Sequence, residues 1–387
     1  MFSLALSTAH PLTAYGWDPG FAERFTPFAE QGLCPGRIVR VDRGRVDAVV
    51  PDGDGVRTVL ADTAPVATGD PMRVPCTGDW AALDLGPGKA HVDGFVRALL
   101  PRRTAFVRST SSKRAEGQVL ATNLDHIVIC VSLAEPLDLG RIERFLALAM
   151  SGAADEEPPA APSPAGGARP VVVLTKADLA GTPEGVAHLV ADTESVAPGV
   201  PVLAVSATTG DGLDVLRAVL AGGTSVLLGR SGAGKSTLVN ALVGEEVQRV
   251  QEIRDRDGKG RHTTTTRDLR PLPGGGVLID TPGLRGVGMW DAETGLARTF
   301  ADVEELAAQC RFHDCAHRSE PGCAVQEAVE SGELSVRRLA SYGKLQRENQ
   351  HIVAKTDARL RAEIRREWRQ KQALGRHMAE RKRGPRG

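Results

Sequence analysis

Short apolar runs separated by Gly, Asp and Pro fill the chain between residues 36 and 100. The runs have the length of β-strands, and the separating residues are those that turns require. The runs are RIVRVDRGRVDAVV, VRTVLA, DPMRVP, WAALDL and HVDGFVRALL. Several short strands in this space predict a small β-barrel of the OB type, and an SH3-like barrel would give the same pattern. Residues 1–30 show no such period and are expected to be irregular.

A different pattern begins near residue 122, where apolar runs alternate with stretches of helical spacing. The apolar runs lie in TNLDHIVICVSL, VVVLT, PVLAVS, TSVLLG and GVLIDTPG. The helical stretches are LGRIERFLALAM, residues 184–196, GLDVLRAVL and KSTLVNALV. Strands that alternate with helices predict a parallel sheet covered on both faces.

These patterns predict an α/β protein of several domains, as a length of 387 residues allows. We expect an N-terminal extension (1–34), an OB-fold barrel (35–103), a parallel-sheet domain (104–292) and a helical domain with a basic C-terminal helix (293–387). Residues 151–170, SGAADEEPPAAPSPAGGARP, are rich in Ala and Pro. Because such a segment cannot bury a core, it is predicted to be a disordered insertion.

Charge is unevenly distributed, although its total is zero. Residues 335–387 contain sixteen Lys and Arg and five Asp and Glu, a net charge of +11. A basic segment on an otherwise acidic chain indicates a polyanionic partner such as nucleic acid, and a solvated charged helix would have the same composition. No apolar run approaches the roughly 20 residues that span a bilayer. We therefore expect a cytoplasmic protein with no membrane partner, and nothing demands more than a monomer.

The stretch GRSGAGKST (229–237) matches the phosphate-loop pattern G-x-x-x-x-G-K-[ST] between a predicted strand and helix. The glycines let successive backbone N–H groups point at phosphates, and the helix N-terminus adds its positive end. Lys235 is expected to reach the β- and γ-phosphates, and the Ser236 hydroxyl to hold Mg²⁺. The predicted nucleotide contacts in this loop are Gly229, Arg230, Ser231, Gly232, Ala233, Gly234, Lys235, Ser236 and Thr237.

The run LIDTPG (278–283) places an acidic residue at the end of another apolar strand. Asp280 can bind Mg²⁺ through water, and the Gly283 N–H can meet the γ-phosphate. The polar stretch DGKGRHTTTTRDLR (257–270) between the two motifs is expected to be a mobile switch loop, although a solvated linker would read alike. Thr264, with Thr265 as the neighbouring choice, is expected to bind Mg²⁺ when GTP is present.

The residues TKAD (175–178) indicate that the base is guanine. The Asp178 carboxylate can accept hydrogen bonds from guanine N1–H and N2–H₂, and adenine offers no such pair of donors. The aliphatic stem of Lys176 would lie over the base. VSA (205–207) follows the next strand, where the Ala207 N–H can recognise guanine O6. The predicted base site comprises Thr175, Lys176, Ala177, Asp178, Ser206 and Ala207.

The order of the motifs along the chain is unusual, because the base reader precedes the phosphate loop. The order TKAD, SA, GxxxxGKS, switch threonine, DTPG is a circular permutation of the usual small GTPase order. The ends of a Ras-like domain lie close together, so they can be joined without changing the sheet. The sequence therefore predicts a circularly permuted Ras-like P-loop domain.

Three of the six cysteines cluster around one histidine, in the spacing Cys310-x₄-Cys315-x-His317-x₅-Cys323. Three thiolates and an imidazole form a closed tetrahedral set suited to one structural Zn²⁺. A reducing compartment disfavours disulfides, which leaves metal binding as the interpretation of this cluster.

Together these motifs resemble the ribosome small-subunit-dependent GTPase A family of bacterial ribosome-assembly factors. The residues that carry the resemblance are TKAD, GRSGAGKST, GRHTTT, DTPG and the Cys/His spacing. The resemblance implies an OB-fold, a permuted GTPase and a zinc domain that bind the small (30S) ribosomal subunit and its 16S rRNA in late maturation. It also implies hydrolysis of GTP to GDP and phosphate, stimulated by the subunit. The chain departs from the family pattern at Thr175, where Asn is usual, and in the insertion at 151–170.

Leu284 stands where many GTPases have a Gln that orients water. Slow intrinsic hydrolysis is expected, with help from His262 in the switch region or from a partner. An alternative is a nucleotide-gated RNA- or DNA-binding clamp in which hydrolysis is incidental. A P-loop ATPase or kinase is disfavoured by Asp178.

Overall fold

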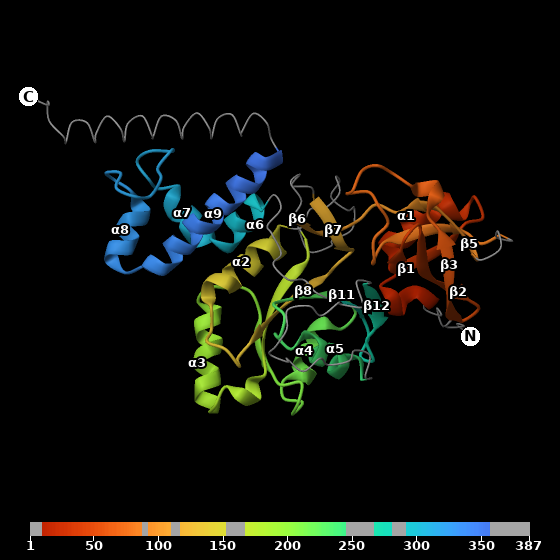
Figure 1. Cartoon of the computed structure of the whole chain (residues 1–387), viewed down its shortest axis with the longest axis horizontal. Coiled ribbons are helices and arrows are strands. Elements are labelled where there is room, and N and C mark those ends of the chain that lie inside the picture. Colours follow the sequence, from red (N-terminus) through yellow and green to blue (C-terminus); the bar gives the residue numbers. More distant parts are fainter. Residues whose placement is uncertain are drawn as a thin grey trace, which may run out of the picture.

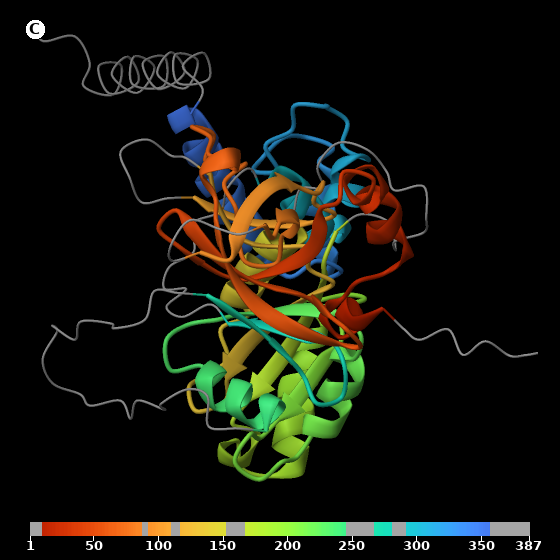
Figure 2. The ribbon, with the colours of Figure 1, turned by 90° about the vertical axis from the view of Figure 1, so that its right-hand side faces the viewer.

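Three regions make up the structure, a computed structural model that describes residues 10–86, 92–109, 117–151, 167–244, 267–280 and 292–356. A β-barrel lies on one side of a sheet covered by helices, and a helical C-terminal region lies on the other (Figure 1). Turned by 90°, the barrel lies across one end of the sheet domain (Figure 2). The predicted barrel, parallel sheet and Cys/His-containing region are confirmed.

The barrel is closed, with strands in the order β1-β2-β3-β5-β4. Its strands are β1 (Cys34–Asp42), β2 (Arg45–Asp52), β3 (Gly55–Asp62), β4 (Trp80–Asp84) and β5 (Gly94–Leu99). Alternate residues such as Val46, Ala48 and Val50 point inward and are fully buried. The prediction of a strand at DPMRVP is wrong. This segment forms turns, in which the Asp70 carboxylate accepts a hydrogen bond from the Met72 N–H.

Residues 11–15 and 19–29 form helices where the sequence was expected to be irregular. Helix α1 (Pro19–Ala29) begins at Asp18, whose side chain accepts the Phe21 N–H at 3.0 Å. Phe21 and Phe25 are one helical turn apart and pack with Trp17 and Trp80 in one aromatic cluster. Tertiary packing of this aromatic face stabilises a helix whose apolar positions are too few to identify it by period alone.

The central sheet has the order β10-β9-β8-β11-β13-β12. Its strands are β8 (His126–Ser132), β9 (Arg169–Thr175), β10 (Val202–Val205), β11 (Thr224–Leu228), β12 (Asp268–Pro271) and β13 (Val277–Asp280). All neighbours are parallel except the β12–β13 pair. Edge strand β12 was assigned to the switch loop in the sequence, because DLRP is short and carries two charges. A separate hairpin pairs β6 (Ala105–Ser109) with β7 (Gly117–Thr122).

Helices cover both faces of this sheet and bury alternate strand residues. Ile127 and Ile129 of β8 pack with α2 (Leu139–Met150) and α3 (Pro183–Glu194). Val128 and Cys130 point to the other face, toward α4 (Leu213–Leu220) and α5 (Lys235–Val243). Burial on both faces explains the continuous apolar runs seen in the sequence.

The C-terminal region packs on α2. Its helices are α6 (Glu293–Thr299), α7 (Ala301–Ala307), α8 (Ala324–Ser331) and α9 (Val336–Thr356). A Cβ atom at Gly295 of α6 would lie 1.9 Å from the Ala147 carbonyl oxygen of α2, so only glycine allows this approach.

A buried charge cluster also joins α2 to this region. Glu143 is fully buried and accepts hydrogen bonds from Arg337 at 2.9 and 3.0 Å and from Arg338 at 2.8 Å. Arg338 also pairs with Asp302 at 2.9 Å and stacks on Phe300. A buried carboxylate needs such partners, because an uncompensated one would be costly.

Several sequence predictions fall outside the described residues: His262, Thr264, Gly283, Leu284, most of the 151–170 insertion and the C-terminal tail beyond 356. Of the helices that the structure does describe, none combines the length and the apolar character needed to cross a bilayer.

Candidate functional site

The predicted nucleotide-binding motifs meet at one edge of the sheet. Strands β8, β9, β10, β11 and β13 are parallel, so their carboxyl ends lie at the same edge. TKAD begins at the last residue of β9, SA follows β10, the phosphate loop follows β11, and Asp280 ends β13. In open α/β sheets this edge is where ligands bind.

The loop after β11 has the backbone that its glycines predict. Gly232 and Gly234 have φ values of 81° and 77°, in the left-handed region. A Cβ atom at Gly229 would lie 2.5 Å from the Cys130 carbonyl oxygen, so the loop can lie this close to β8 only with glycine there. The Lys235 side chain folds back over the loop, and its Nζ donates hydrogen bonds to the Gly229 and Arg230 carbonyl oxygens at 2.7 and 2.6 Å. Ser236 and Thr237 lie in the first turn of α5.

The TKAD segment contacts the phosphate loop directly. Thr175 is buried, and its hydroxyl lies 2.8 Å from the Ala233 carbonyl oxygen and 3.2 Å from that of Val131. Lys176 takes a left-handed backbone with φ 59°, which starts the short 3₁₀ turn that carries Ala177 and Asp178. Thr175 therefore connects β9 to the loop after β11, across the intervening β8.

Asp178 is exposed in the middle of this turn, and a neighbouring side chain fixes its position. The Ser206 hydroxyl donates to Asp178 Oδ1 at 2.6 Å and also accepts the Thr209 N–H at 3.2 Å. Ala207, which is half-buried, follows Ser206. The structure thus brings the two predicted parts of the base site together.

Replacing Thr175 by Val should destabilise the junction between these two loops. Valine has nearly the same shape but cannot donate to the Ala233 carbonyl, and a buried acceptor left without its donor costs about 1–3 kcal/mol. Chemical denaturation should show this loss in the free energy of unfolding, while Thr175→Ser, which keeps the hydroxyl, should stay close to the parent protein. Equal stability of the Val and Ser variants would contradict this interpretation.

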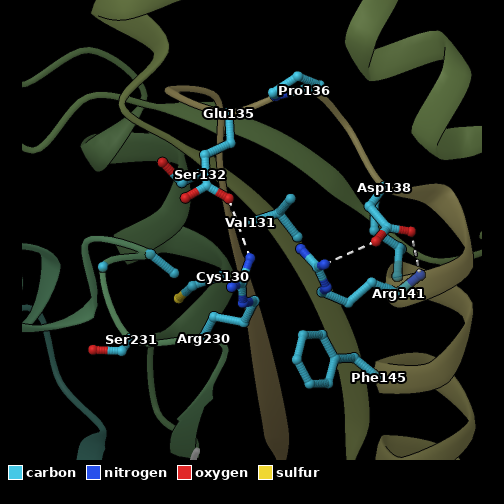
Figure 3. A pocket seen from close by; sticks show the side chains of 13 residues that line it. Cys130, Val131, Ser132, Glu135, Pro136, Asp138, Arg141, Phe145, Arg230 and Ser231 are labelled. Atoms are coloured by element: carbon cyan, nitrogen blue, oxygen red, sulfur yellow. Dashed lines mark hydrogen bonds and ion pairs between the residues drawn. The ribbon is translucent and has the colours of Figure 1, made fainter. Parts of the chain in front are cut away.

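A pocket opens on the other side of the phosphate loop, toward α2 (Figure 3). Two ion pairs lie at it: Arg230 contacts Glu135 at 3.2 Å, and Arg141 contacts Asp138 at 2.9 Å. Phe145 contributes an apolar wall. Sequence reasoning missed Glu135 and Arg141, because they come from a segment some 90 residues before the phosphate loop.

Negative charge concentrates at the end of β13. Asp268 of β12 lies directly opposite Asp280 in the antiparallel register. Burial and, secondarily, the Asp268 charge raise the pKa of Asp280 to about 6. Asp268 was not among the predicted site residues, and only the strand pairing reveals it.

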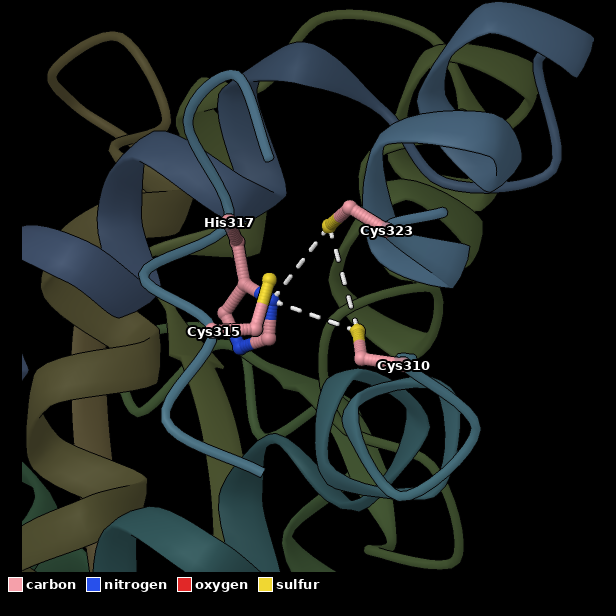
Figure 4. Close-up of side chains that lie close together, drawn as sticks. All are labelled: Cys310, Cys315, His317 and Cys323. Atoms are coloured by element: carbon pink, nitrogen blue, oxygen red, sulfur yellow. Dashed lines mark hydrogen bonds between the residues drawn. The ribbon is translucent and has the colours of Figure 1, made fainter. Parts of the chain in front are cut away.

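The predicted metal ligands converge in the loop between α7 and α8 (Figure 4). The ligand atoms of Cys310, Cys315, His317 and Cys323 all lie within 4.8 Å of one another. His317 Nδ1 lies 3.6 Å from the Cys310 sulfur and 3.5 Å from the Cys323 sulfur. Ligands of one tetrahedral zinc ion, with bonds of about 2.0–2.3 Å, are separated by roughly 3.3–3.8 Å, so the cluster could hold a metal ion.

Nearby groups fix the backbone of this loop. The Glu320 carboxylate accepts N–H groups from Ala316, Arg318 and Ser319 at 2.8–3.2 Å, and these bonds lower the pKa of Glu320 to about 2. His317 has a left-handed φ of 54°, and its carbonyl accepts a bond of 2.5 Å from the Gln326 side chain. These contacts fix the backbone on both sides of His317.

Sequence comparisons agree with this geometry. Residues 99–290 match the model of the RsgA GTPase family. A protein of Streptomyces avermitilis named small ribosomal subunit biogenesis GTPase RsgA is 61% identical over 378 residues, which cover 98% of this chain and 96% of that protein. A protein of the same name from Streptomyces coelicolor is also 61% identical, over 96% of each chain.

Solved structures support the same assignment. YjeQ from Thermotoga maritima matches with a TM-score of 0.55 and 25% identity, over 82% of this chain and 98% of that one. YloQ, described as a circularly permuted GTPase, has a TM-score of 0.57 at 22% identity, over 82% and 96% of the two chains, and so supports the fold. The permuted motif order and the Cys/His cluster thus occur in a chain that belongs to the RsgA GTPase family.

Proposed function

We propose that this protein is a GTPase that binds the small ribosomal subunit and acts in its late maturation, hydrolysing GTP to GDP and phosphate. The observation that carries the proposal is the contact between the base reader and the phosphate loop. The Thr175 hydroxyl reaches the loop, and the Ser206 hydroxyl fixes the Asp178 carboxylate. The names of the Streptomyces relatives supply the ribosomal context.

Each motif has a role in this reaction. The backbone N–H groups of residues 229–236 surround the phosphates, and Lys235 exchanges its loop carbonyls for β- and γ-phosphate oxygens. The Ser236 hydroxyl and the Asp280 carboxylate would hold Mg²⁺, which when bound would neutralise charge on the phosphate oxygens. Water attacks the γ-phosphorus, the bond to the bridging oxygen breaks, and GDP leaves. Asp178, with Ser206 and Ala207, selects guanine.

Three further residues complete the proposal from the sequence. Thr264 is proposed as the switch threonine that binds Mg²⁺, and Gly283 as an N–H donor to the γ-phosphate. His262 is proposed to help position the attacking water, since Leu284 cannot do so.

The Cys/His cluster is proposed to bind one structural zinc ion. All four positions are protein ligands, so such a site leaves no open coordination position for catalysis. The role of the ion is then to stabilise the small C-terminal region.

The partner is proposed to be the 30S subunit, contacted through its 16S rRNA, with the protein acting as a cytoplasmic monomer. The net charge of +11 on residues 335–387 suits a phosphate backbone. The barrel and the metal-binding loop offer further surfaces of kinds that bind RNA.

GTP hydrolysis should rise strongly when small ribosomal subunits are added to the purified protein. Release of phosphate is measured for the protein alone, with small subunits, and with large subunits as the control. A rise specific to small subunits would support both the activity and the partner. Tight GTP binding without any rise would instead favour a nucleotide-gated RNA-binding module with incidental hydrolysis.

A further inference from the structure

A tight turn of the barrel presses against the strand that carries Asp280. The turn comprises residues Cys76–Asp79, and at its tip Gly78 has a φ of 99°. A Cβ atom there would lie 2.4 Å from the Thr122 carbonyl oxygen and 3.1 Å from the Cδ1 atom of Ile279. Because Ile279 immediately precedes Asp280, the barrel touches the sheet one residue from the proposed cation ligand.

Buried bonds hold this turn in one conformation. Asp79 is fully buried, and its carboxylate pairs with the Arg102 guanidinium through two contacts of 2.8 Å. The same carboxylate accepts the Cys76 N–H at 2.8 Å. The Asn123 side chain donates to the Gly78 carbonyl at 3.0 Å. Because Arg102 and Asn123 both hold the turn, a displacement of the barrel moves the turn as a whole instead of deforming it.

The barrel also holds the beginning of β12. The Thr77 hydroxyl donates to the Arg267 carbonyl at 3.2 Å, and Arg267 is partly buried. The next residue, Asp268, is paired with two arginines. Its Oδ1 lies 3.9 Å from Arg40 Nε of β1, and its Oδ2 lies 3.6 Å from Arg270 Nη2 of β12. Asp268 is the carboxylate opposite Asp280.

We propose that the Cys76–Asp79 turn and Arg40 are positioning elements by which the barrel sets the affinity of the nucleotide site for its divalent cation. The inference rests on the proposed function, because it assigns the cation to Asp280. The turn fixes where the ends of β12 and β13 lie. Arg40 offsets part of the Asp268 charge that would otherwise attract the cation.

This arrangement gives a partner bound to the barrel a direct route to the reaction. Displacing the barrel moves Gly78 away from Ile279 and Arg40 away from Asp268 at the same time. Both contacts end beside Asp280, and neither involves the base-recognition residues. Cation affinity and turnover would therefore change while the choice of base would not.

Gly78→Ala tests the turn, and Gly44→Ala is its matched control. Gly44 has a similar φ of 71° in a turn of the same barrel, but a Cβ atom there meets nothing within 4 Å. We expect Gly78→Ala to weaken Mn²⁺ binding to the GDP complex by about tenfold, as other changes next to metal ligands do, and to lower kcat more than it raises KM. Gly44→Ala should leave Mn²⁺ binding, kcat and KM unchanged. Mn²⁺ affinity is measured by electron paramagnetic resonance.

Two surface variants test the charge pair without disturbing the fold. Asp268→Asn should weaken Mn²⁺ binding, and Arg40→Gln should strengthen it, each by about two- to fivefold. Arg40→Lys keeps the charge and should retain the parent affinity. Shifts of the same sign in Asp268→Asn and Arg40→Gln, or equal behaviour of Gly78→Ala and Gly44→Ala, would overturn the inference. Failure of the parent protein to bind GDP would instead refute the proposed function.

Discussion

Replacing Asp178 by Asn should lower the affinity for GTP by roughly 100- to 10,000-fold and create a preference for xanthosine triphosphate. The carboxylate accepts from two guanine donors, and an Asn amide would turn an N–H group toward one of them. Xanthine carries a carbonyl oxygen in place of the guanine amino group, so it can accept from that amide. The Ser206 hydroxyl, 2.6 Å from Oδ1, can still donate to the amide oxygen and keep the side chain oriented.

Titration calorimetry with the two triphosphates measures this exchange of preference. Asp138→Asn is the matched control, because Asp138 lines the pocket beside the phosphate loop and Asn also caps helices well. Its affinity for GTP should stay near that of the parent protein. Unchanged GTP binding by Asp178→Asn would show that the base is recognised elsewhere.

Removing the proposed zinc ion should unfold much of the C-terminal region. In zinc-finger peptides the binding free energy reaches about 10–16 kcal/mol, which is far more than a small helical core supplies. Cys323→Ser removes the ligand that stands at the start of α8 and is buried in the core shared by α6, α8 and α9. Helical content by circular dichroism and bound zinc by mass spectrometry should fall together, and a zinc chelator should have the same effect.

Cys34→Ser in the barrel is the control for loss of a thiol, because Cys34 lies far from the cluster in the fold. It should keep both the zinc and the helical content. A fully helical Cys323→Ser protein that binds no metal would show that the cluster does not stabilise the region.

Much of the candidate site could be predicted because its chemistry is local. The phosphate loop, TKAD and the Cys/His spacing each depend on residues within about fourteen positions, and the structure brings each set together. Asp268 could not be predicted this way, since its relation to Asp280 exists only through the β12–β13 register. Glu135 reaches the phosphate loop through an ion pair between distant segments.

The fold was predictable where period and length were clear, and less so at short or charged elements. The strands of the central sheet that are buried on both faces read as apolar runs. Helix α1 was missed because its signals, Asp18 as N-cap and the spacing of Phe21 and Phe25, are few. Arg37 and Glu143 look like surface residues in the sequence, yet they are 1% and 0% exposed. Contacts between distant regions bury these two side chains, and the sequence of a single strand or helix does not reveal such contacts.

The burial of Glu143 determines how the protein can be divided. Cutting the chain before α6 would remove Arg337 and Arg338, which pair with the Glu143 carboxylate, and would expose that carboxylate to water. It would also uncover the surface of α2 on which Gly295 rests. The nucleotide-binding part is therefore not a self-sufficient module.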